Sequence, residues 1–349
     1  MTQIPKIDIL SLNLKELEGE LLKLDEPKYR AKQVYSWLVK GAWGEEMRNI
    51  PLALRKKLEE VFEFRLPKVK LKLVSKLDGT IKYLFELIDG ECIEAVFMKY
   101  EHGNTLCISS QVGCRMGCKF CASTLAGRVR DLTPSEMLGQ IITAQKDTGE
   151  RISNVVMMGI GEPLDNYDNV IKFLRLVSSE DGLNIGLRHI SVSSCGLVDK
   201  INDLANEGLP ITLSISLHAY DNQVRSAIMP INNKYPIEAL LKACQGYFEK
   251  TGRRISFEYT LIADKNDTQE GAIQLASLLK KYIKSTPHVN LIPLNEVKET
   301  RLSTSKNVNL FKNKLISLGI NATVRRKLGS DINASCGQLR RQTKEENDS

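Results

Sequence analysis

The sequence has little of what marks a membrane, secreted or zinc-finger protein. No apolar run in its 349 residues reaches the roughly 20 residues that a membrane-spanning helix needs. The first residues, Met1–Leu10, lack the apolar core of a secretory signal. We therefore expect a cytoplasmic protein with no membrane partner. Histidine is scarce, and none of the four histidines has the paired spacing of a zinc finger: His102, His189, His218 and His288.

Neither sign of charge dominates strongly. Lys and Arg number 49 against 42 Asp and Glu, which leaves a net charge of +7 and a pI near 8.8. This mildly basic balance is compatible with a polyanionic partner, but many enzymes without such a partner share it. The composition, 42% hydrophobic and 26% charged, is ordinary for a globular protein. The length suits one large domain and one small one.

Cysteine, in contrast, is plentiful, with eight in the chain. In a reducing compartment this number favours metal binding or catalysis over a disulfide framework. Cys114, Cys118 and Cys121 have C-x3-C-x2-C spacing and follow the apolar run Leu106–Val112, which we interpret as a buried strand. Their loop would leave the carboxyl end of that strand, where α/β sheets and barrels hold their reactive groups. Phe120 would shield the third cysteine from water.

The triplet itself leaves three interpretations open. A structural zinc site usually takes four ligands, arranged as pairs of cysteine or histidine. An iron–sulfur cube held by three cysteines would instead leave one iron open to a non-protein ligand. The third interpretation is three buried thiols in a core strand and turn.

The order of patterns along the chain predicts three regions. Residues 1–65 have leucines at helical spacing, and basic and aromatic residues alternate within Asp25–Lys40, which suits either an RNA-binding face or a solvated one. Residues 67–100 alternate apolar and polar positions around Asp78-Gly79 and Asp89-Gly90, as in an antiparallel meander. Glu94 would lie in the last meander strand, on the face opposite Ile93.

From Thr105 onward, strands and helices alternate, which predicts a parallel sheet with right-handed crossovers. Six such strands are too few for a closed eight-stranded barrel, and a doubly wound open sheet is the alternative. Residues 296–308 are expected to form a mobile loop over the site, and residues 340–349 a frayed tail. The predicted strands are 105–112, 153–158, 189–194, 211–217, 255–262 and 288–292, with a final one near 320–326. The predicted helices are 134–149, 166–178, 197–207, 236–250, 268–284 and 304–318.

Polar residues follow several of these strands on the predicted catalytic rim. The turn Gly159–Pro163 matches G-x-G but lacks the third glycine of a dinucleotide-binding fingerprint. Its glycines expose backbone carbonyls and its carboxylate suits an ammonium group. Taken singly, such residues are more often turns or caps than ligands. The rim candidates are Gly161, Glu162, Ser193, Ser216, Leu217, His218 and Asn295.

The cysteine motif, with an aromatic before its last cysteine, resembles the signature of the radical S-adenosylmethionine (SAM) superfamily. Cys107 with the following Ile-Ser-Ser-Gln-Val-Gly, and the segment Asp331–Leu339, resemble the RlmN/Cfr family of RNA methyltransferases over nearly the whole chain. The resemblance implies an α/β fold, a partial (β/α)6 TIM-like barrel. It implies a small helical RNA-binding domain at 1–66, a β-meander linker at 67–103, a radical SAM core at 104–340 and a polar tail at 341–349.

The same resemblance implies roles for individual residues. Cys114, Cys118 and Cys121 would hold a [4Fe-4S] cluster, and the rim candidates would bind SAM. Cys336 would become S-methylated, and Cys107 would resolve it through a transient disulfide. Either Glu94 or Cys107 would accept the proton from the methylated carbon.

The resemblance also implies the reaction and its partners. One SAM would methylate Cys336, and a second would yield the radical that activates this methyl group for addition to C2 of an adenine. The substrates would be 23S rRNA, at the peptidyl transferase centre, and some tRNAs, at the adenosine 3′ to the anticodon. Flavodoxin or ferredoxin would supply electrons to a monomer.

Two other interpretations remain at this point. A Cfr-type enzyme would methylate C8 of the same rRNA adenosine, although Pro163 favours the RlmN type. A non-enzymatic RNA-binding protein with a structural metal would have no use for Cys336.

Overall fold

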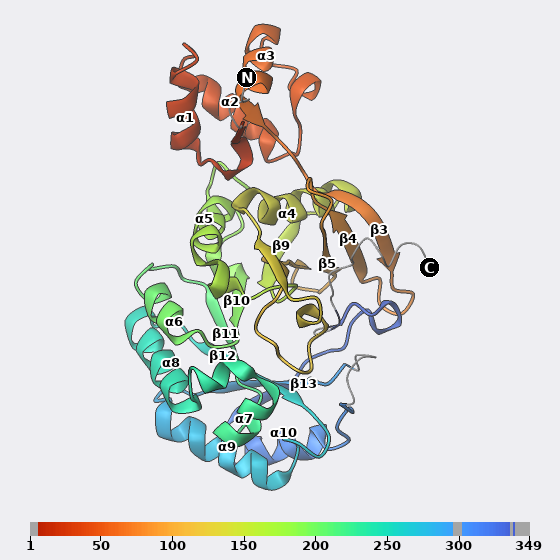
Figure 1. The fold of residues 1–349 in the computed structure, drawn as a ribbon, viewed down its shortest axis with the longest axis vertical. Coiled ribbons are helices and arrows are strands. Elements are labelled where there is room, and N and C mark those ends of the chain that lie inside the picture. The colour runs from red at the N-terminus through yellow and green to blue at the C-terminus, as the bar shows by residue number, and fades with distance from the viewer. Residues whose placement is uncertain (1–5, 296–301, 336–337, 339–349) are drawn as a thin grey trace.

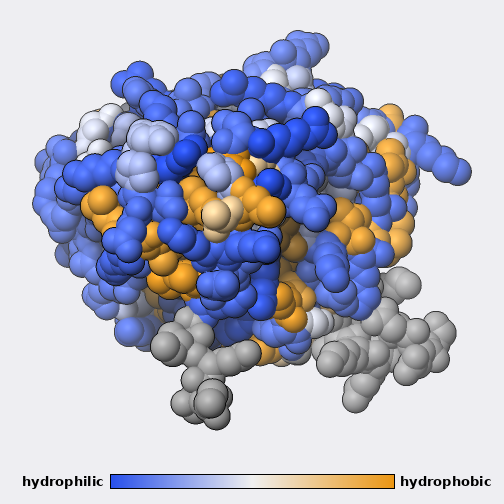
Figure 2. Space-filling model, turned by 90° about the horizontal axis from the view of Figure 1, so that it is seen from above, coloured by the Kyte–Doolittle hydropathy of each residue, from blue (hydrophilic) through white to orange (hydrophobic). Residues whose placement is uncertain are grey.

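The computed structural model of the chain describes residues 6–295, 302–335 and 338. A small helical part occupies one end of the molecule, and the strands and helices of a larger barrel-like part make up the rest (Figure 1). The face seen in Figure 2 is mainly hydrophilic, with apolar side chains in separate patches. In the described ranges, no helix is both long and apolar enough to cross a membrane.

The N-terminal part is helical, as predicted. Its helices are α1 (Leu14–Leu22), α2 (Tyr29–Leu38) and α3 (Leu52–Val61). Two short strands pair in parallel and join the two ends of this part, namely β1 (Ile7–Asp8) and β2 (Phe62–Glu63). Both are too short to show an alternation of apolar and polar residues. Short 3-10 helices follow β1 and precede α3: η1 (Ile9–Ser11) and η2 (Gly44–Glu46).

This part rests on two helices of the core, α4 (Pro134–Thr148) and α5 (Tyr167–Ser178). The backbone N–H of Ser135 donates to Oγ of Ser11 at 3.1 Å. Nζ of Lys146 donates to the carbonyl of Gly41 at 2.7 Å. Gly41 has φ +70°, and a Cβ there would lie 2.7 Å from the Ile142 side chain. The close approach explains why glycine occupies this position.

The meander is present as predicted, with β3 (Lys68–Val74), β4 (Ile81–Glu86) and β5 (Cys92–Met98) antiparallel to one another. Its turns place Gly79 at φ +71° and Gly90 at φ +82°, a region that glycine enters without strain. β5 then pairs antiparallel with β6 (Asn104–Cys107). The meander therefore shares one ten-stranded sheet with the core.

The core strands run parallel and lie in the order in which they occur in the chain. After β6 come β9 (Ile152–Met157), β10 (Ile190–Ser194), β11 (Thr212–Ser216), β12 (Ile255–Leu261), β13 (His288–Pro293) and β14 (Asn321–Val324). Consecutive order is typical of barrel winding, whereas a doubly wound sheet reverses its order at a switch point. In the described sheet β14 and β3 are the edges, so the barrel is open, and the partial-barrel prediction is confirmed.

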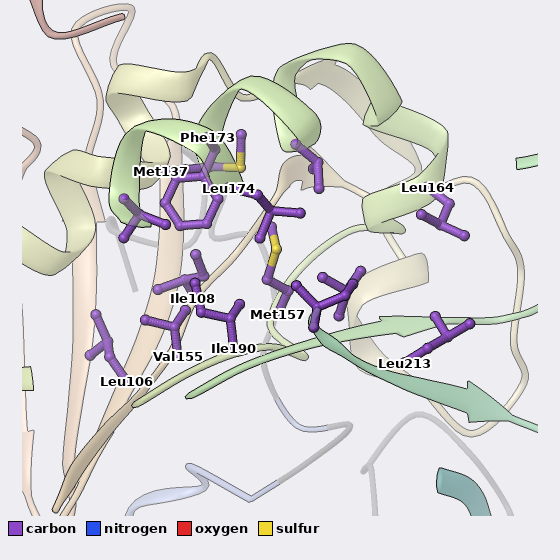
Figure 3. Packing of buried hydrophobic residues seen from close by; sticks show 14 of the residues in the cluster. Leu106, Ile108, Met137, Val155, Met157, Leu164, Phe173, Leu174, Ile190 and Leu213 are labelled. Atoms are coloured by element: carbon purple, nitrogen blue, oxygen red, sulfur yellow. The ribbon is translucent and has the colours of Figure 1, made fainter. Parts of the chain in front are cut away.

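Helices cover the outer face of the sheet. Beyond α4 and α5 these are α6 (Val198–Leu204), α8 (Ile237–Thr251), α9 (Gln269–Tyr282) and α10 (Val308–Ser317). Figure 3 shows Leu106, Val155 and Ile190 from three strands packed beneath Phe173 and Leu174 of α5. Because side chains alternate along a strand, the intervening polar residues face the barrel interior. Ser191 and Ser214 there lie within hydrogen-bond distance, with their Oγ atoms 3.1 Å apart.

One predicted strand was wrong. The run 105–112 does not continue as a single strand, because β6 ends at Cys107 and β7 (Gln111–Gly113) pairs antiparallel with β8 (Arg128–Asp131) in a separate small sheet. Between them the N–H of Ser109 donates to the side chain of Gln140 at 2.9 Å instead of to a neighbouring strand. The cysteine loop therefore leaves a small ribbon attached to the barrel.

The end of the predicted loop 296–308 is anchored. Residues 296–301 lie outside the described residues. Beyond them, Oγ1 of Thr304 donates to the carbonyl of Leu294 at 2.8 Å, and Oγ of Ser305 donates to Asp267 at 2.6 Å. These contacts hold the approach to α10, which begins at Val308, four residues later than predicted.

Candidate active site

A cavity of about 980 Å³ opens at the carboxyl ends of the parallel strands. The three cysteines of the triplet line it on one side. Most of the predicted rim residues line it on the others, namely Gly161, Glu162, Ser193, Ser216, His218 and Asn295. Leu217 is the exception, because its side chain is fully buried in the hydrophobic core. Its backbone N–H donates to Glu258 and its carbonyl accepts from Arg225.

The cysteine loop is held by its own backbone and by α7 (Asn222–Ile228), a helix that the sequence did not predict. The N–H of Cys121 donates to the carbonyl of Cys118 at 3.1 Å, and Oγ1 of Thr124 donates to the carbonyl of Cys121 at 2.9 Å. The N–H of Lys119 donates to the carbonyl of Ile228 at the end of α7. The triplet therefore has a defined backbone path along one wall of the cavity.

The thiols of this loop are suited to a metal centre. Burial raises the pKa of Cys114 to about 12 and holds the pKa of Cys118 well above its usual range. Cys121 is half-buried on the same wall. A bound iron centre supplies the positive charge that stabilises such thiolates. Among the described residues, no three His, Cys, Asp or Glu side chains are placed to hold a single metal ion.

Glu162 is buried at the turn after β9. Its Oε1 accepts from the N–H of Leu164 at 3.0 Å and its Oε2 accepts from the N–H of Cys195 at 2.7 Å. Burial raises its pKa, although these hydrogen bonds act in the opposite direction. The side chains of Cys195 and Ser194 also hydrogen-bond to this carboxylate. The group lines the cavity, and a carboxylate is a suitable partner for an ammonium ion there.

Gln111 supports this turn, and sequence reasoning missed it. Its side-chain oxygen accepts from the N–H of Glu162 at 2.8 Å. Gly161 has φ +105°, and a Cβ there would lie 2.6 Å from the Cβ of Gln111. The glycine is therefore required by the close approach of β7 to the turn. No local pattern marks Gln111, because it is 51 positions before Glu162 in the chain.

His218 is a buried neutral imidazole between β12 and the cysteine loop. Its Nδ1 accepts from the N–H of Thr260 at 2.8 Å, and its ring meets Phe120 edge-to-face at 4.9 Å. Burial lowers its pKa to about 3. Phe120, the aromatic residue of the motif, lines the same cavity as the three cysteines.

Arg225 is a second residue that sequence reasoning missed. It is fully buried on α7 and donates to the carbonyls of Cys195 (2.6 Å), Leu217 (3.1 Å) and Ser216 (3.1 Å). A guanidinium with five fixed donors suits such a set of acceptors. Arg225 therefore joins the carboxyl ends of β10 and β11 beside the cavity. In the sequence an isolated arginine in a polar stretch resembles a solvated charge.

A second cavity, of about 570 Å³, adjoins the first. The two share four lining residues: Met158, Ile292, Asn295 and Arg325. Cys107 lines the second cavity from β6, where it pairs with Val96 of β5. Ala334 and Ser335 line it from the C-terminal segment. Cys336 itself lies outside the described residues, but the residues that precede it are in the cavity of Cys107.

Glu94 is on the strand that borders this second cavity, although it is not one of the residues that line it. It is on β5, two residues before Val96 and hence on the same face of the strand. It is 3% exposed rather than solvent-facing, and its Oε1 lies 2.9 Å from Nζ of Lys82. The charged partner permits burial of the carboxylate.

A loop with three cysteines at the carboxyl ends of an open parallel barrel, facing a ring of polar rim residues, defines a radical SAM enzyme. Residues 108–276 match the family model of the radical SAM superfamily. Residues 7–64 match the model of the ribosomal RNA large subunit methyltransferase N-terminal domain. The barrel and the N-terminal helices thus match two separate models.

Known proteins resemble the chain over nearly its whole length. A probable dual-specificity RNA methyltransferase RlmN of Clostridium novyi is 53% identical over 96% of this chain and 98% of its own. Another of that description, from Clostridium botulinum, is 55% identical over 96% of each chain. The crystal structure of a radical SAM methyltransferase from Sphaerobacter thermophilus has a TM-score of 0.91 and 40% identity, covering 95% of this chain and 99% of that one.

The chain belongs to the RlmN family of dual-specificity RNA methyltransferases. It is therefore a SAM-dependent RNA-methylating enzyme, and its cofactors are a [4Fe-4S] cluster and SAM. The donor set fits these groups, because two buried thiols, one half-buried thiol and a buried carboxylate face one cavity.

Proposed function

We propose that the enzyme methylates C2 of adenosine, in 23S rRNA at the peptidyl transferase centre and in some tRNAs 3′ to the anticodon. The methyl group passes through Cys336, and Cys107 releases it by forming a transient disulfide. The observation that carries this proposal is the adjoining pair of cavities. One is lined by the cysteine triplet, and the other by Cys107 together with Ala334 and Ser335.

In this proposal Cys114, Cys118 and Cys121 hold the cluster. Glu162 accepts from the ammonium group of SAM, beside Gly161. The polar rim residues Ser193, Ser216, His218 and Asn295 contact the rest of the SAM molecule. Leu217 does not contact SAM, since its backbone N–H and carbonyl already have partners. It contributes by holding the backbone of Ser216 and His218 in place. When bound, the cluster and SAM supply the one-electron chemistry that activates the methyl group on Cys336.

Cys107 completes the reaction. Its thiolate attacks the sulfur of Cys336 and forms an S–S bond while the bond between that sulfur and the methyl carbon on the base breaks. The methyl carbon takes up a proton, and an external reductant that delivers two electrons and two protons restores both thiols. Flavodoxin or ferredoxin supplies the single electrons that the cluster would need. Glu94 or Cys107 accepts the C2 proton before this step. Glu94 is available for that role because its strand face borders the cavity of Cys107.

The RNA would approach from the open side of the second cavity. Arg326 and Lys327 are exposed at its rim, and Tyr100 lines it. Cations at this place suit the phosphates on either side of a nucleotide whose base is flipped into the cavity. In the small helical domain, Arg30 stacks over the exposed ring of Tyr29 at 5.0 Å, a pair suited to contact RNA.

Identification of the methylated nucleoside tests this function. The enzyme is reconstituted anaerobically with iron and sulfide, then incubated with methyl-labelled SAM, a reductant and unmodified 23S rRNA fragment. Nucleoside mass spectrometry should detect 2-methyladenosine. The product should disappear in Cys336→Ala and persist in Cys244→Ala, a control in the core away from both cavities. 8-Methyladenosine would instead assign a Cfr-type enzyme, and absence of both products and of 5′-deoxyadenosine would contradict radical methylation.

A further inference from the structure

The β3–β4 hairpin holds the segment that leads to Cys336. Oδ1 of Asp331 accepts from Oγ of Ser75 at 2.7 Å, and its Oδ2 accepts from the N–H of Lys76 at 2.9 Å. In the reverse direction, Oδ2 of Asp78 accepts from the N–H of Gly329 at 2.9 Å. These contacts join residues more than 250 positions apart in the chain.

A fourth contact connects the same segment to Glu94. Nζ of Lys82 donates to the carbonyl of Asn333 at 3.3 Å and forms the ion pair with Glu94 at 2.9 Å. The Lys82 and Glu94 side chains are only 11% and 4% exposed. One ammonium group thus touches the proposed proton acceptor and the backbone three residues before Cys336.

The segment is itself a tight loop. The N–H of Ala334 donates to the carbonyl of Gly329 at 2.9 Å, and Oγ of Ser335 donates to the carbonyl of Leu328 at 3.0 Å. Gly329 has φ +58°, and a Cβ there would lie 2.7 Å from the Cβ of Ala334 and 3.0 Å from Thr80 of the hairpin. The loop and the hairpin are therefore in close contact, and the loop directs Ser335 into the cavity of Cys107.

We propose that the β3–β4 hairpin is a clamp that holds residues 329–335, the segment leading to Cys336, in the cavity of Cys107. Asp331 and Asp78 are its positioning residues, and Lys82 is its link to Glu94. The proposal rests on the proposed function, since it assigns Cys336 and Cys107 as the reacting pair. Its physical basis is effective concentration. A tethered loop with a fixed origin keeps one thiol near the other, and a free loop would spread that thiol over a larger volume.

The charge state of the clamp supports this role. The hydrogen bonds from Ser75 and from the Lys76 N–H lower the pKa of Asp331, so this side chain is a carboxylate at neutral pH. A carboxylate is a stronger acceptor than a neutral amide, and it accepts from both partners at once. Asp331→Asn keeps the shape but replaces one acceptor oxygen with a donor, so one of the two hydrogen bonds is lost.

The equilibrium between the Cys107–Cys336 disulfide and glutathione tests the clamp. Full-length reconstituted enzyme is incubated anaerobically, without SAM or RNA, in buffers of defined ratio of reduced to oxidised glutathione. In this exchange one oxidised glutathione takes up the two electrons of the cysteine pair and yields two reduced glutathiones. Acid quenching, alkylation and peptide mass spectrometry give the effective concentration of one thiol at the other.

We expect Asp331→Asn and Asp78→Asn each to lower this effective concentration by about tenfold. Asp89→Asn is the matched control, since it lies in the other turn of the meander and pairs with Arg130. It should leave the value unchanged, and thermal unfolding of every variant checks that the fold is retained. An effective concentration unchanged in both clamp variants, or no disulfide in the wild type, would overturn the clamp.

The disulfide equilibrium can be measured without methyl transfer, so the clamp and the proposed function can be refuted independently. A wild-type disulfide that weakens in the clamp variants, in an enzyme that makes no 2-methyladenosine, would sustain the clamp and refute only the proposed function.

Discussion

His218 shows how burial sets the chemistry of a single side chain at this site. Its backbone is left-handed, with φ +55°, and its ring has no contact with solvent beyond the cavity. The folded pKa of about 3 lies below the usual value of 6.5. Between these two values the unfolded chain binds a proton that the folded protein does not bind. The free energy of unfolding must therefore fall as the pH decreases from 6.5 toward 3.

Replacing this histidine should weaken the pH dependence of stability. His218→Asn keeps an acceptor near the Thr260 N–H and tolerates left-handed backbone. For one proton the wild-type slope approaches about 1.4 kcal/mol per pH unit, and the variant should lose that contribution. Urea unfolding of iron-free protein between pH 7 and pH 5 measures it, with His102→Asn on the surface as the control. Equal slopes for wild type and His218→Asn would contradict the assignment.

At this scale the sequence shows the residues whose chemistry depends on spacing. The three cysteines and the Gly161-Glu162 turn can be found from local pattern alone. Arg225 and Gln111 cannot, since the partners that place them at the site, the Cys195 carbonyl and the Glu162 N–H, are brought close by the fold from distant positions. Glu94 also looks ordinary in the sequence, because only the structure shows that its partner Lys82 is buried with it.

Among the elements, the small β7–β8 ribbon decides where the cysteine loop begins. Gly113 ends β7 with φ +74°, and a Cβ there would lie 1.8 Å from the carbonyl of Gly127. Gly127 also has a positive φ, +64°, but a Cβ there would meet nothing within 4 Å. The two glycines therefore separate the effect of crowding from that of backbone strain.

Gly113→Ala should displace the cysteine loop and prevent stable cluster binding. Gly127→Ala should cost only the roughly 1 kcal/mol of a left-handed alanine and retain the cluster. Iron content and visible absorbance after anaerobic reconstitution distinguish the two. Full iron loading in Gly113→Ala would show that the close contact does not determine the loop.

The sequence predicts the main elements well and the connections poorly. The strand–helix alternation from Thr105 onward is strong because each element buries one face. The division of 105–112 has no such signal, since the contacts that separate the two strands come from distant residues, among them Gln140 and Glu94. Helix α7 is short and polar on most of its surface, so its periodicity is weak.

In the whole molecule, the second cavity has two exposed cations at its rim, Arg326 and Lys327, where we propose that RNA binds. The cavity surface depends on residues far apart in the chain, among them Tyr100, Cys107 and Arg326. The order of elements in the sequence could predict an open barrel, because strands that are consecutive in the chain are also neighbours in the sheet. It could not predict this cavity, which forms only when the meander, β6 and the C-terminal segment meet.

Removing the two cations at the rim of the second cavity should weaken RNA binding through charge alone. The double variant Arg326→Gln/Lys327→Gln should bind a 23S rRNA fragment less tightly, and its slope of log K against log salt should decrease by about 1.5 to 2. Lys280→Gln/Lys281→Gln on the outer helix α9 removes the same charge elsewhere. An identical salt slope in wild type and the rim variant would place the RNA on another surface.

The transfer of one methyl group from SAM through Cys336 to RNA can be followed directly. The enzyme is charged with labelled SAM without RNA, and its peptides are analysed by mass spectrometry before and after RNA and reductant are added. We expect label on Cys336 first and then on C2 of adenosine, with a Cys107–Cys336 disulfide formed at the same time. In Cys107→Ala the label should remain in a covalent protein–RNA adduct. Labelled RNA from Cys336→Ala, or label that never resides on Cys336, would contradict transfer through Cys336.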